Sequence, residues 1–182
     1  MNTIVTQEGD AVFEPEDRYS ELMIGAGTER RKMLTLDGKR DWKNLITLDM
    51  SERVNPDILH DLNDLPLPIA DESFDEVHAY HVLEHLGVQG DFRTFFAQFT
   101  EFHRILKPGG IFYAAVPSWD SVHAFGDPGH TRIINETTIT FLQQDRYGQP
   151  PMTDYRDFYK VDFECLAAEH KDETFIFALR KK

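Results

Sequence analysis

The chain has 182 residues, with 19 Lys and Arg against 32 Asp and Glu and a formal net charge of −13, so it has the length of one domain with a core of its own. This acidic balance argues against a broad phosphate-binding surface, because nonspecific affinity for nucleic acid comes mainly from Lys and Arg, and we expect no nucleic-acid partner. We expect a cytoplasmic protein without a membrane segment, because no long apolar run marks a span, the acidic start does not resemble a secretory signal, and the single Cys165 fits a reducing compartment.

The first 19 residues form an acidic segment with little apolar periodicity. Such a segment is poorly ordered unless it docks on the rest of the chain. We therefore expect residues 1–19 to be an N-terminal tail or lid, and residues 20–182 to form the domain itself.

A short apolar run, Leu22 to Ile24, ends in Gly25-Ala26-Gly27. An uninterrupted run of this kind is typical of a buried parallel strand. Glycines after such a strand allow unusual dihedrals and let a ligand approach the backbone closely. A Gly-x-Gly alone fits an ordinary tight turn equally well.

The next apolar run, residues 45–48, ends in Asp49, which follows Gly27 by 22 residues. This is close to the roughly 20 residues expected between a glycine turn and an acid that holds a ribose. Asp49 alone could be a turn residue at a strand end, but its spacing to the glycines favours a ligand-binding role.

Residues 29–42, between these two strands, leave room for only a short helix. They include the consecutive Arg30, Arg31 and Lys32, which fit either a local basic patch or a solvated helix face. Further on, residues 58–62 have the apolar character of a third strand.

The central strand is expected from residue 74 onward, and it runs directly into His81, Glu84 and His85. Polar groups at the carboxyl end of a strand lie where open α/β sheets bind ligands. The most economical interpretation of Glu84 and His85 is that they fix the turn after the strand through hydrogen bonds.

The same three residues match H-x-x-E-H, the inverted zinc-protease motif. That alternative, a zinc hydrolase, needs a long helix and a third ligand, for which Glu164 and Glu169 are candidates. Here the motif directly follows a strand, so we expect no metal site.

The clearest helix covers residues 92–106. Its apolar residues recur every three or four positions, which is typical of one buried helical face, and they are Phe92, Phe95, Phe96, Phe99, Phe102, Ile105 and Leu106. We expect this aromatic stripe to be core packing. Residues 107–110 contain a proline and two glycines that would end the helix.

Four further elements complete the expected fold. Residues 111–116 predict a strand, and Asn135 is suited to cap a helix that continues to Leu142. Residues 158–165 and 174–179 alternate like two strands joined by a polar turn, an antiparallel pair at the edge of the sheet.

Five motifs stand in a characteristic order: L-M-I-G-A-G at 22–27, L-I-T-L-D at 45–49, H-D-L-N-D-L-P at 60–66, S-F-D-E-V-H-A-Y-H-V-L-E-H-L at 73–86 and R-I-L-K-P-G-G at 104–110. Together they resemble the small, single-domain class I S-adenosylmethionine-dependent methyltransferases. The resemblance implies an α/β, three-layer, Rossmann-like fold with a seven-stranded sheet, order 3-2-1-4-5-7-6, strand 7 antiparallel, and helices on both faces. It also implies S-adenosyl-L-methionine as cofactor and S-adenosyl-L-homocysteine as product.

The resemblance places a cofactor site at the ends of four strands, comprising Gly25, Ala26, Gly27, Asp49, Met50, Asp61, Leu62, Tyr80 and His81. The glycine turn would admit the methionyl part and Asp49 would bind the ribose. Asp61 would bind the adenine amino group, and Tyr80 and His81 would lie beside the sulfonium. The chain departs from the family pattern at Met23, where an acid is usual, and at Glu29, where a third glycine is usual.

The methyl acceptor is expected to meet the loop of residues 118–132, and we expect a small molecule. If the acceptor is a hydroxyl or an amine, His130 is the candidate base, with Asp127 to orient its ring. His81 and His123 are the next candidates. The alternative is a protein that keeps this fold and binds the cofactor without catalysis. The oligomeric state stays open.

Overall fold

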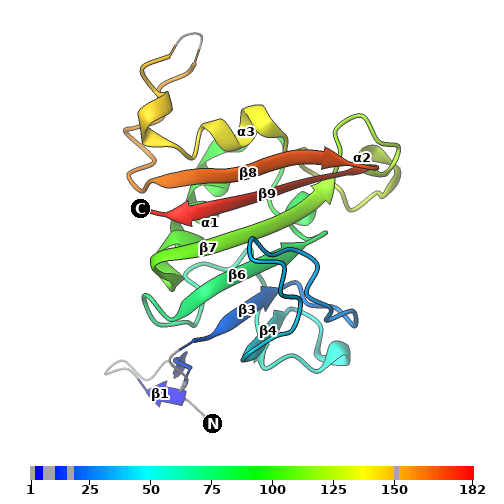
Figure 1. Cartoon of the computed structure of the whole chain (residues 1–182), viewed down its shortest axis with the longest axis vertical. Coiled ribbons are helices and arrows are strands. Elements are labelled where there is room, and N and C mark those ends of the chain that lie inside the picture. Colours follow the sequence, from blue (N-terminus) through cyan, green and yellow to red (C-terminus); the bar gives the residue numbers. More distant parts are fainter. Residues whose placement is uncertain (1–2, 6–10, 16–18, 150–151) are drawn as a thin grey trace.

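The computed structural model describes residues 3–5, 11–15, 19–149 and 152–182. Seven strands form one sheet in the order β5-β4-β3-β6-β7-β9-β8 (Figure 1). Their bounds are Glu21–Ile24 for β3, Leu45–Asp49 for β4, Ile58–Leu59 for β5, Phe74–Tyr80 for β6, Leu106–Pro117 for β7, Phe163–Lys171 for β8 and Thr174–Lys181 for β9. The first five are parallel, and β9 runs antiparallel to both β7 and β8. Counted along the chain, the order is 3-2-1-4-5-7-6, so the expected fold class is confirmed.

Two expected strands have different bounds. The third strand ends at Leu59 rather than Leu62. The backbone N–H of His60 still donates to the carbonyl of Asp49, and a turn at residues 62–63 follows. The sixth strand begins at Phe163 instead of residue 158. Before it, Tyr159 is completely buried against the ring of Phe96, 4.9 Å away between centroids, so this segment serves the core and not the sheet.

Helices α1 (Phe92–Ile105) and α3 (Glu136–Thr140) pack on one face of the sheet in a single hydrophobic core. The aromatic stripe is core packing, as expected: the ring of Phe102 stacks on Phe112 of β7 at 5.0 Å between centroids. The side chain of Asp91 caps the start of α1 by accepting the backbone N–H of Thr94. Asn135 caps α3 as expected, although the helix ends at Thr140 rather than Leu142. The other helical pieces are short: α2 (His123–Gly126) and the 3-10 turns η1 (Glu52–Val54), η2 (Leu83–His85) and η3 (Gln144–Arg146).

Part of the N-terminal segment docks as a two-stranded antiparallel hairpin, β1 (Thr3–Val5) with β2 (Ala11–Phe13). The backbone of Phe13 exchanges hydrogen bonds with Pro68 and Ala70, and its ring stacks on Phe74 at 6.2 Å. Phe74 is the first residue of β6, so this contact lies at the amino ends of the strands.

The second face of the sheet carries an irregular coil, residues 28–44, which loops over it (Figure 1). The helix expected within residues 29–42 does not form. Hydroxyl oxygens of Tyr80 and Tyr113 in the sheet accept the backbone N–H groups of Leu34 and Leu36. The backbone N–H groups of Leu34 and Leu36 thus have hydrogen-bond acceptors on the sheet, so this segment satisfies them without forming a helix.

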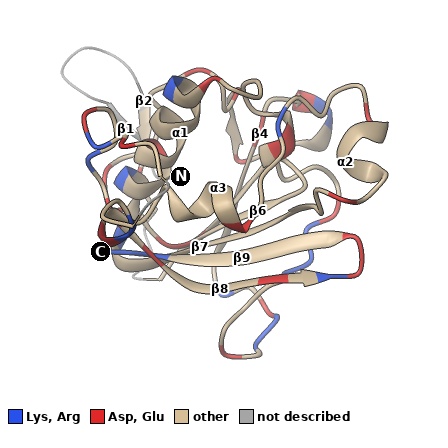
Figure 2. Ribbon diagram, turned by 90° about the horizontal axis from the view of Figure 1, so that it is seen from above, with Lys and Arg blue, Asp and Glu red and all other residues tan. Residues whose placement is uncertain are grey.

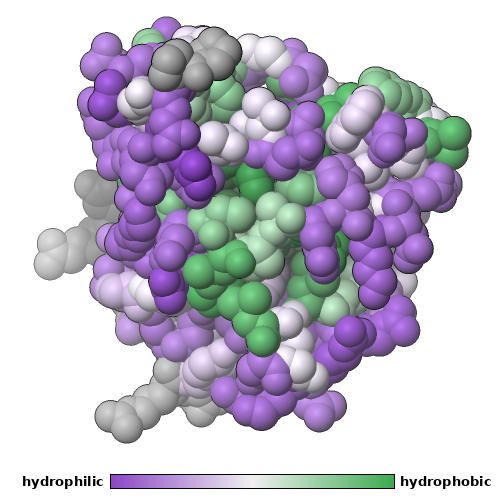
Figure 3. Space-filling view, turned by 45° about the horizontal axis from the view of Figure 1, so that its top comes forward, coloured by the Kyte–Doolittle hydropathy of each residue, from purple (hydrophilic) through white to green (hydrophobic). Residues whose placement is uncertain are grey.

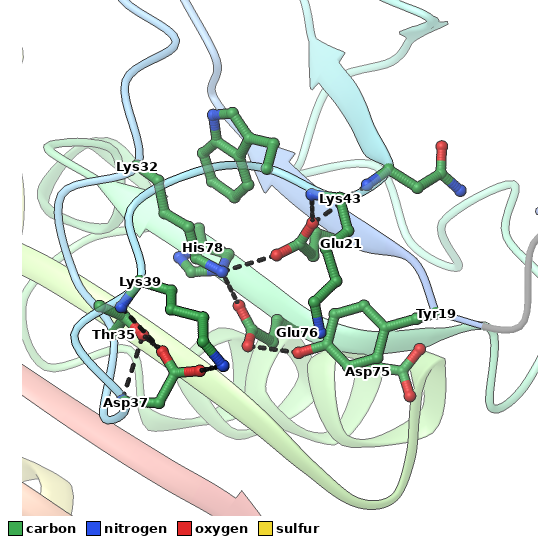
Figure 4. Close-up of polar contacts among 12 residues, drawn as sticks. Tyr19, Glu21, Lys32, Thr35, Asp37, Lys39, Lys43, Asp75, Glu76 and His78 are labelled. Atoms are coloured by element: carbon green, nitrogen blue, oxygen red, sulfur yellow. Dashed lines mark hydrogen bonds and ion pairs between the residues drawn. The ribbon is translucent and has the colours of Figure 1, made fainter.

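A buried charge network fastens this coil to the sheet (Figure 4). The Lys32 ammonium lies 2.6 Å from Glu21 of β3 and 2.6 Å from Glu76 of β6. Burial alone would raise the pKa of Glu76, but hydrogen bonds from His78, Lys32 and Tyr19 outweigh it and hold the pKa at about 2. A fully paired ion cluster of this kind is the form in which Lys and Glu can be buried.

Neither alternative for the basic trio is therefore correct for Lys32, which is buried in an ion pair. Arg30 donates to the backbone carbonyls of Val54 and Asn55, and Arg31 is exposed. Lys and Arg are scattered over the ribbon without forming a stripe (Figure 2). Among the described residues, no helix is long and apolar enough to cross a bilayer.

A cavity of about 580 Å³ lies between the coil and the strands β8 and β9. On the face of the molecule drawn in Figure 3, apolar side chains gather near the middle and hydrophilic side chains surround them.

Candidate functional site

The carboxyl ends of β3 and β6 mark the point where the chain changes direction across the sheet. From β3 the chain continues to β4 and β5 on one side, and it crosses back to β6 on the other. Ligands of open α/β sheets bind in the crevice at such a switch point. The predicted cofactor residues therefore belong to one edge of the sheet.

The two glycines of the turn after β3 have different reasons to be glycine. Both have positive φ, +58° at Gly25 and +52° at Gly27, where side chains are disfavoured. A Cβ at Gly25 would lie 2.3 Å from Cγ2 of Val82, so packing excludes it. A Cβ at Gly27 would meet nothing within 4 Å, so this residue faces open space where a ligand can approach.

Asp49, the last residue of β4, closes this turn. One carboxylate oxygen accepts the backbone N–H of Gly27 at 2.9 Å, and the other accepts that of Ser51 at 2.8 Å. Each carboxylate oxygen can accept a second hydrogen bond, so both keep capacity for the hydroxyls of a sugar. The 22-residue spacing thus brings Asp49 and the glycine turn into direct contact, as predicted.

The remaining predicted cofactor residues follow the neighbouring strands β3, β4 and β5. Met50 is 69% exposed, whereas Leu62 is buried. Asp61 follows β5, and one of its oxygens accepts the backbone N–H of Asn63. Ala26 is buried and donates its backbone N–H to the carbonyl of Leu48.

Tyr80 ends β6 with its side chain under the coil instead of at the edge of the sheet. Its oxygen lies 2.6 Å from Nδ1 of His78 and accepts the Leu34 N–H. Nε2 of His78 lies 2.9 Å from Glu76. Burial lowers the pKa of His78, so Tyr80 is bound to a neutral ring and its hydroxyl is already engaged.

A second cavity opens beside this edge, at the carboxyl ends of β6 and β7, with a volume of about 570 Å³. We call it the histidine pocket; its lining residues are His81, Glu84, His85, Pro117, His123, Asp127, His130, Asp172, Glu173 and Thr174. The structure thus brings together the predicted catalytic residues His81, Asp127 and His130. His81 has a left-handed backbone, φ +52°, a strained conformation that is common at functional sites.

His130 is held by its own loop. Its Nδ1 lies 2.8 Å from the carbonyl oxygen of His123, and its Nε2 lies 3.9 Å from Asp127. Because a carbonyl only accepts, Nδ1 carries the proton and Nε2 keeps the lone pair. Asp127 also accepts the backbone N–H of Gly129, so it forms an ordinary turn as well.

Glu84 and His85 differ from the sequence-based expectation. The Glu84 carboxylate is 2% exposed, and neither oxygen has a hydrogen-bond partner among the described residues. His85 does not fix its own turn, because its Nδ1 lies 3.1 Å from the carbonyl oxygen of Gly129 in a distant loop. In the sequence, the two histidines that flank Glu84 were the available sign of a functional site. Their spacing could not show that the loop around Gly129 lies against His85.

The inverted zinc-protease arrangement is not present in the described residues. Only the last three residues of the motif lie on the 3-10 turn η2, and His81 precedes it, so there is no long helix. Glu164 pairs with Arg180, and Glu169 lines the cavity under the coil instead of the histidine pocket.

Comparison with known proteins gives a consistent result. A family model described as "Methyltransferase domain" matches residues 22–114. The chain is 37% identical over 91 residues to a protein of Mycolicibacterium smegmatis (strain ATCC 700084 / mc(2)155) named "Probable S-adenosylmethionine-dependent methyltransferase", a match that covers 47% of this chain and 32% of that protein. The chain therefore spans about a third of the length of this curated relative.

Solved structures with the same fold include a SAM dependent methyltransferase from Archaeoglobus fulgidus, with a TM-score of 0.58 and 16% identity over 90% of this chain and 86% of that one. The N-methyltransferase NodS from Bradyrhizobium japonicum WM9, in complex with S-adenosyl-l-homocysteine, has a TM-score of 0.53 and 15% identity over 90% and 78% of the two chains. At this identity the likeness is one of fold.

Proposed function

Because the chain belongs to the family of class I S-adenosylmethionine-dependent methyltransferases, we propose that it transfers a methyl group from S-adenosylmethionine to a small molecule bound in the histidine pocket. The observation that carries this proposal is the direct contact of Gly27 with Asp49, 2.9 Å from N to Oδ2, at the switch point of the sheet. The N-methyltransferase NodS, which has the same fold, was crystallised in complex with S-adenosyl-l-homocysteine.

The cofactor fits the residues present. Gly27 faces open space, where the methionyl part can approach the backbone. Asp49 accepts the ribose hydroxyls with its remaining lone pairs, and Asp61 binds the adenine amino group beside the buried Leu62. Ala26, Met50 and the backbone of Tyr80 complete this edge.

The bound cofactor supplies an electrophilic methyl group, and the protein has to align the acceptor with it. Alignment alone removes a large part of the barrier of such a bimolecular step. The histidine pocket, about 570 Å³ in volume, is within the range of small-molecule sites, roughly 300–1,000 Å³. His81 directly follows β6 and lines this pocket.

On the acceptor side, Nε2 of His130 can take a proton from a hydroxyl or an amine as the methyl group transfers. Its Nδ1–H is held by the His123 carbonyl, which orients the ring. The Asp127 carboxylate lies 3.9 Å from Nε2, on the side of the ring that faces the acceptor.

Calorimetry with S-adenosylhomocysteine tests the cofactor site. Asp49→Asn removes a charge-assisted contact worth roughly 1.5–3 kcal/mol, so the product should bind about 10–100-fold more weakly. Asp41→Asn changes an exposed acid on the coil and serves as the matched control. Unchanged affinity in a folded Asp49→Asn variant would remove Asp49 from the site.

A second experiment separates catalysis from binding alone. The protein is incubated with isotope-labelled S-adenosylmethionine and a small-molecule cell extract, and labelled products are sought by mass spectrometry. Cofactor binding without any labelled product, across extracts of several kinds, would favour the non-catalytic alternative.

A further inference from the structure

We propose that Glu84, His85 and His130 bind one divalent transition-metal ion, such as Mn²⁺, Fe²⁺ or Zn²⁺, in the histidine pocket. One ligand atom from each of these residues lies within 4.8 Å of the other two. Sequence alone predicts no metal here, and the proposal departs from that prediction because of three features of the folded chain.

The first feature is the buried carboxylate of Glu84. A carboxylate removed from water is strongly disfavoured unless it is paired or binds a metal. Neither Glu84 oxygen has a hydrogen-bond partner among the described residues. Nδ1 of His81 lies 3.5 Å from Oε1 and pairs with it as an ion only when that ring is protonated. A cation between Glu84 and the two histidines supplies the missing partner.

The second feature is the orientation of both imidazole rings. Nδ1 of His85 donates to the carbonyl of Gly129, and Nδ1 of His130 donates to that of His123. Each ring therefore presents an unprotonated Nε2. Metal-binding histidines are commonly held by such a contact from the other nitrogen to a backbone carbonyl.

The third feature is how the two segments are joined. The backbone carbonyl of Glu84 accepts N–H groups from Thr131 and Arg132, which follow His130 directly. A Cβ at Gly129 would lie only 3.1 Å from Nδ1 of His85, so glycine lets the loop come this close. The ligands are thus positioned by backbone contacts that exist before any ion binds.

The donor set indicates the class of ion. Two imidazoles and one carboxylate suit Zn²⁺ and the divalent ions from Mn²⁺ to Cu²⁺ better than Ca²⁺ or Mg²⁺, which prefer oxygen ligands. Three protein ligands leave coordination positions free for water or substrate. If the proposed function is also correct, an oxygen of the methyl acceptor can occupy such a position, and its pKa would fall. His130 would then act as a ligand and not as the base.

Metal binding is measured directly, without the methyl-transfer reaction. Tag-free protein is stripped with a chelator and titrated with Mn²⁺ and with Zn²⁺ in a calorimeter. We expect one ion per chain, and affinity lowered more than tenfold in Glu84→Gln and in His130→Ala. His170→Ala, which removes a histidine paired with a different glutamate, Glu136, should bind like the parent chain.

A measurement on the unmutated protein guards against variants that misfold. Bound Mn²⁺ should broaden the NMR signals of the His85 and His130 rings most strongly, and those of His103, which packs on Phe163 at the opposite end of the sheet, least. The proposal is overturned if the parent chain binds no ion, or if binding broadens the exposed histidines equally and survives Glu84→Gln. S-adenosylhomocysteine titrations on the same samples keep the two questions apart, because loss of the metal site leaves the contact between Gly27 and Asp49 intact.

Discussion

Replacing Lys32 with Met should destabilise the protein by about 3–5 kcal/mol, the cost of breaking a buried ion pair from one side. The ammonium is 2.6 Å from each of two carboxylates, and the side chains of Lys32, Glu21 and Glu76 are 5%, 0% and 11% exposed. The variant would leave two acids close together in a dry space, where like charges disfavour ionisation. A loss of this size is a large part of the roughly 5–15 kcal/mol that stabilises a typical domain.

Urea unfolding at pH 7 measures this effect. Lys39→Met is the matched control, because the Lys39 ammonium forms an exposed pair with Asp37 beside the same network (Figure 4), and it should not change the midpoint measurably. Lowering the pH should shrink the difference between Lys32→Met and the parent chain, since protonation removes the unpaired charges. A destabilisation below about 1 kcal/mol at pH 7 would refute the claim that this ammonium is the essential counterion of the buried acids.

Two further predictions concern acid stability and the glycine turn. The pKa of Glu76 is about 2 in the fold against an ordinary 4.5, so its contribution of about 3 kcal/mol is present above pH 4.5 and is lost as the pH falls toward 2; urea unfolding between pH 7 and pH 3 should show this loss, and Glu76→Gln should reduce it. Gly25→Ala should destabilise the fold because its Cβ would meet Val82, whereas Gly27→Ala should cost only the roughly 1–2 kcal/mol of left-handed strain while weakening S-adenosylhomocysteine binding. Thermal unfolding and calorimetry distinguish the two, and equal stability losses would contradict the different surroundings of these glycines.

Local patterns in the sequence were enough to predict most of the sheet and the helix that covers one face. The run before Gly25, the spacing to Asp49 and the aromatic period of α1 are all read along the chain, and each has its predicted place. Burial of Lys32 could not be predicted in this way, because its two partners stand 11 and 44 residues away and share no period with it.

The histidine pocket shows the same limit. His85 and the loop of His130 are joined through a contact between residues 44 positions apart. Spacing identified His130 and Asp127 as neighbours, since they belong to one turn. It could not show that Glu84 is buried with no hydrogen bond to its carboxylate from the described residues, because burial depends on how the loop after β7 folds back over η2.

The coil over the second face of the sheet also contains a built-in optical reporter. The chain has two tryptophans, and Trp42 ends this coil with its indole N–H bound to the Arg30 carbonyl and its ring edge-on to His78, 4.8 Å between centroids. Trp119 is half exposed at the far end of β7. In a Trp119→Phe background, fluorescence would come from the coil alone, so lifting of this segment could be followed separately from unfolding of the aromatic core beneath α1.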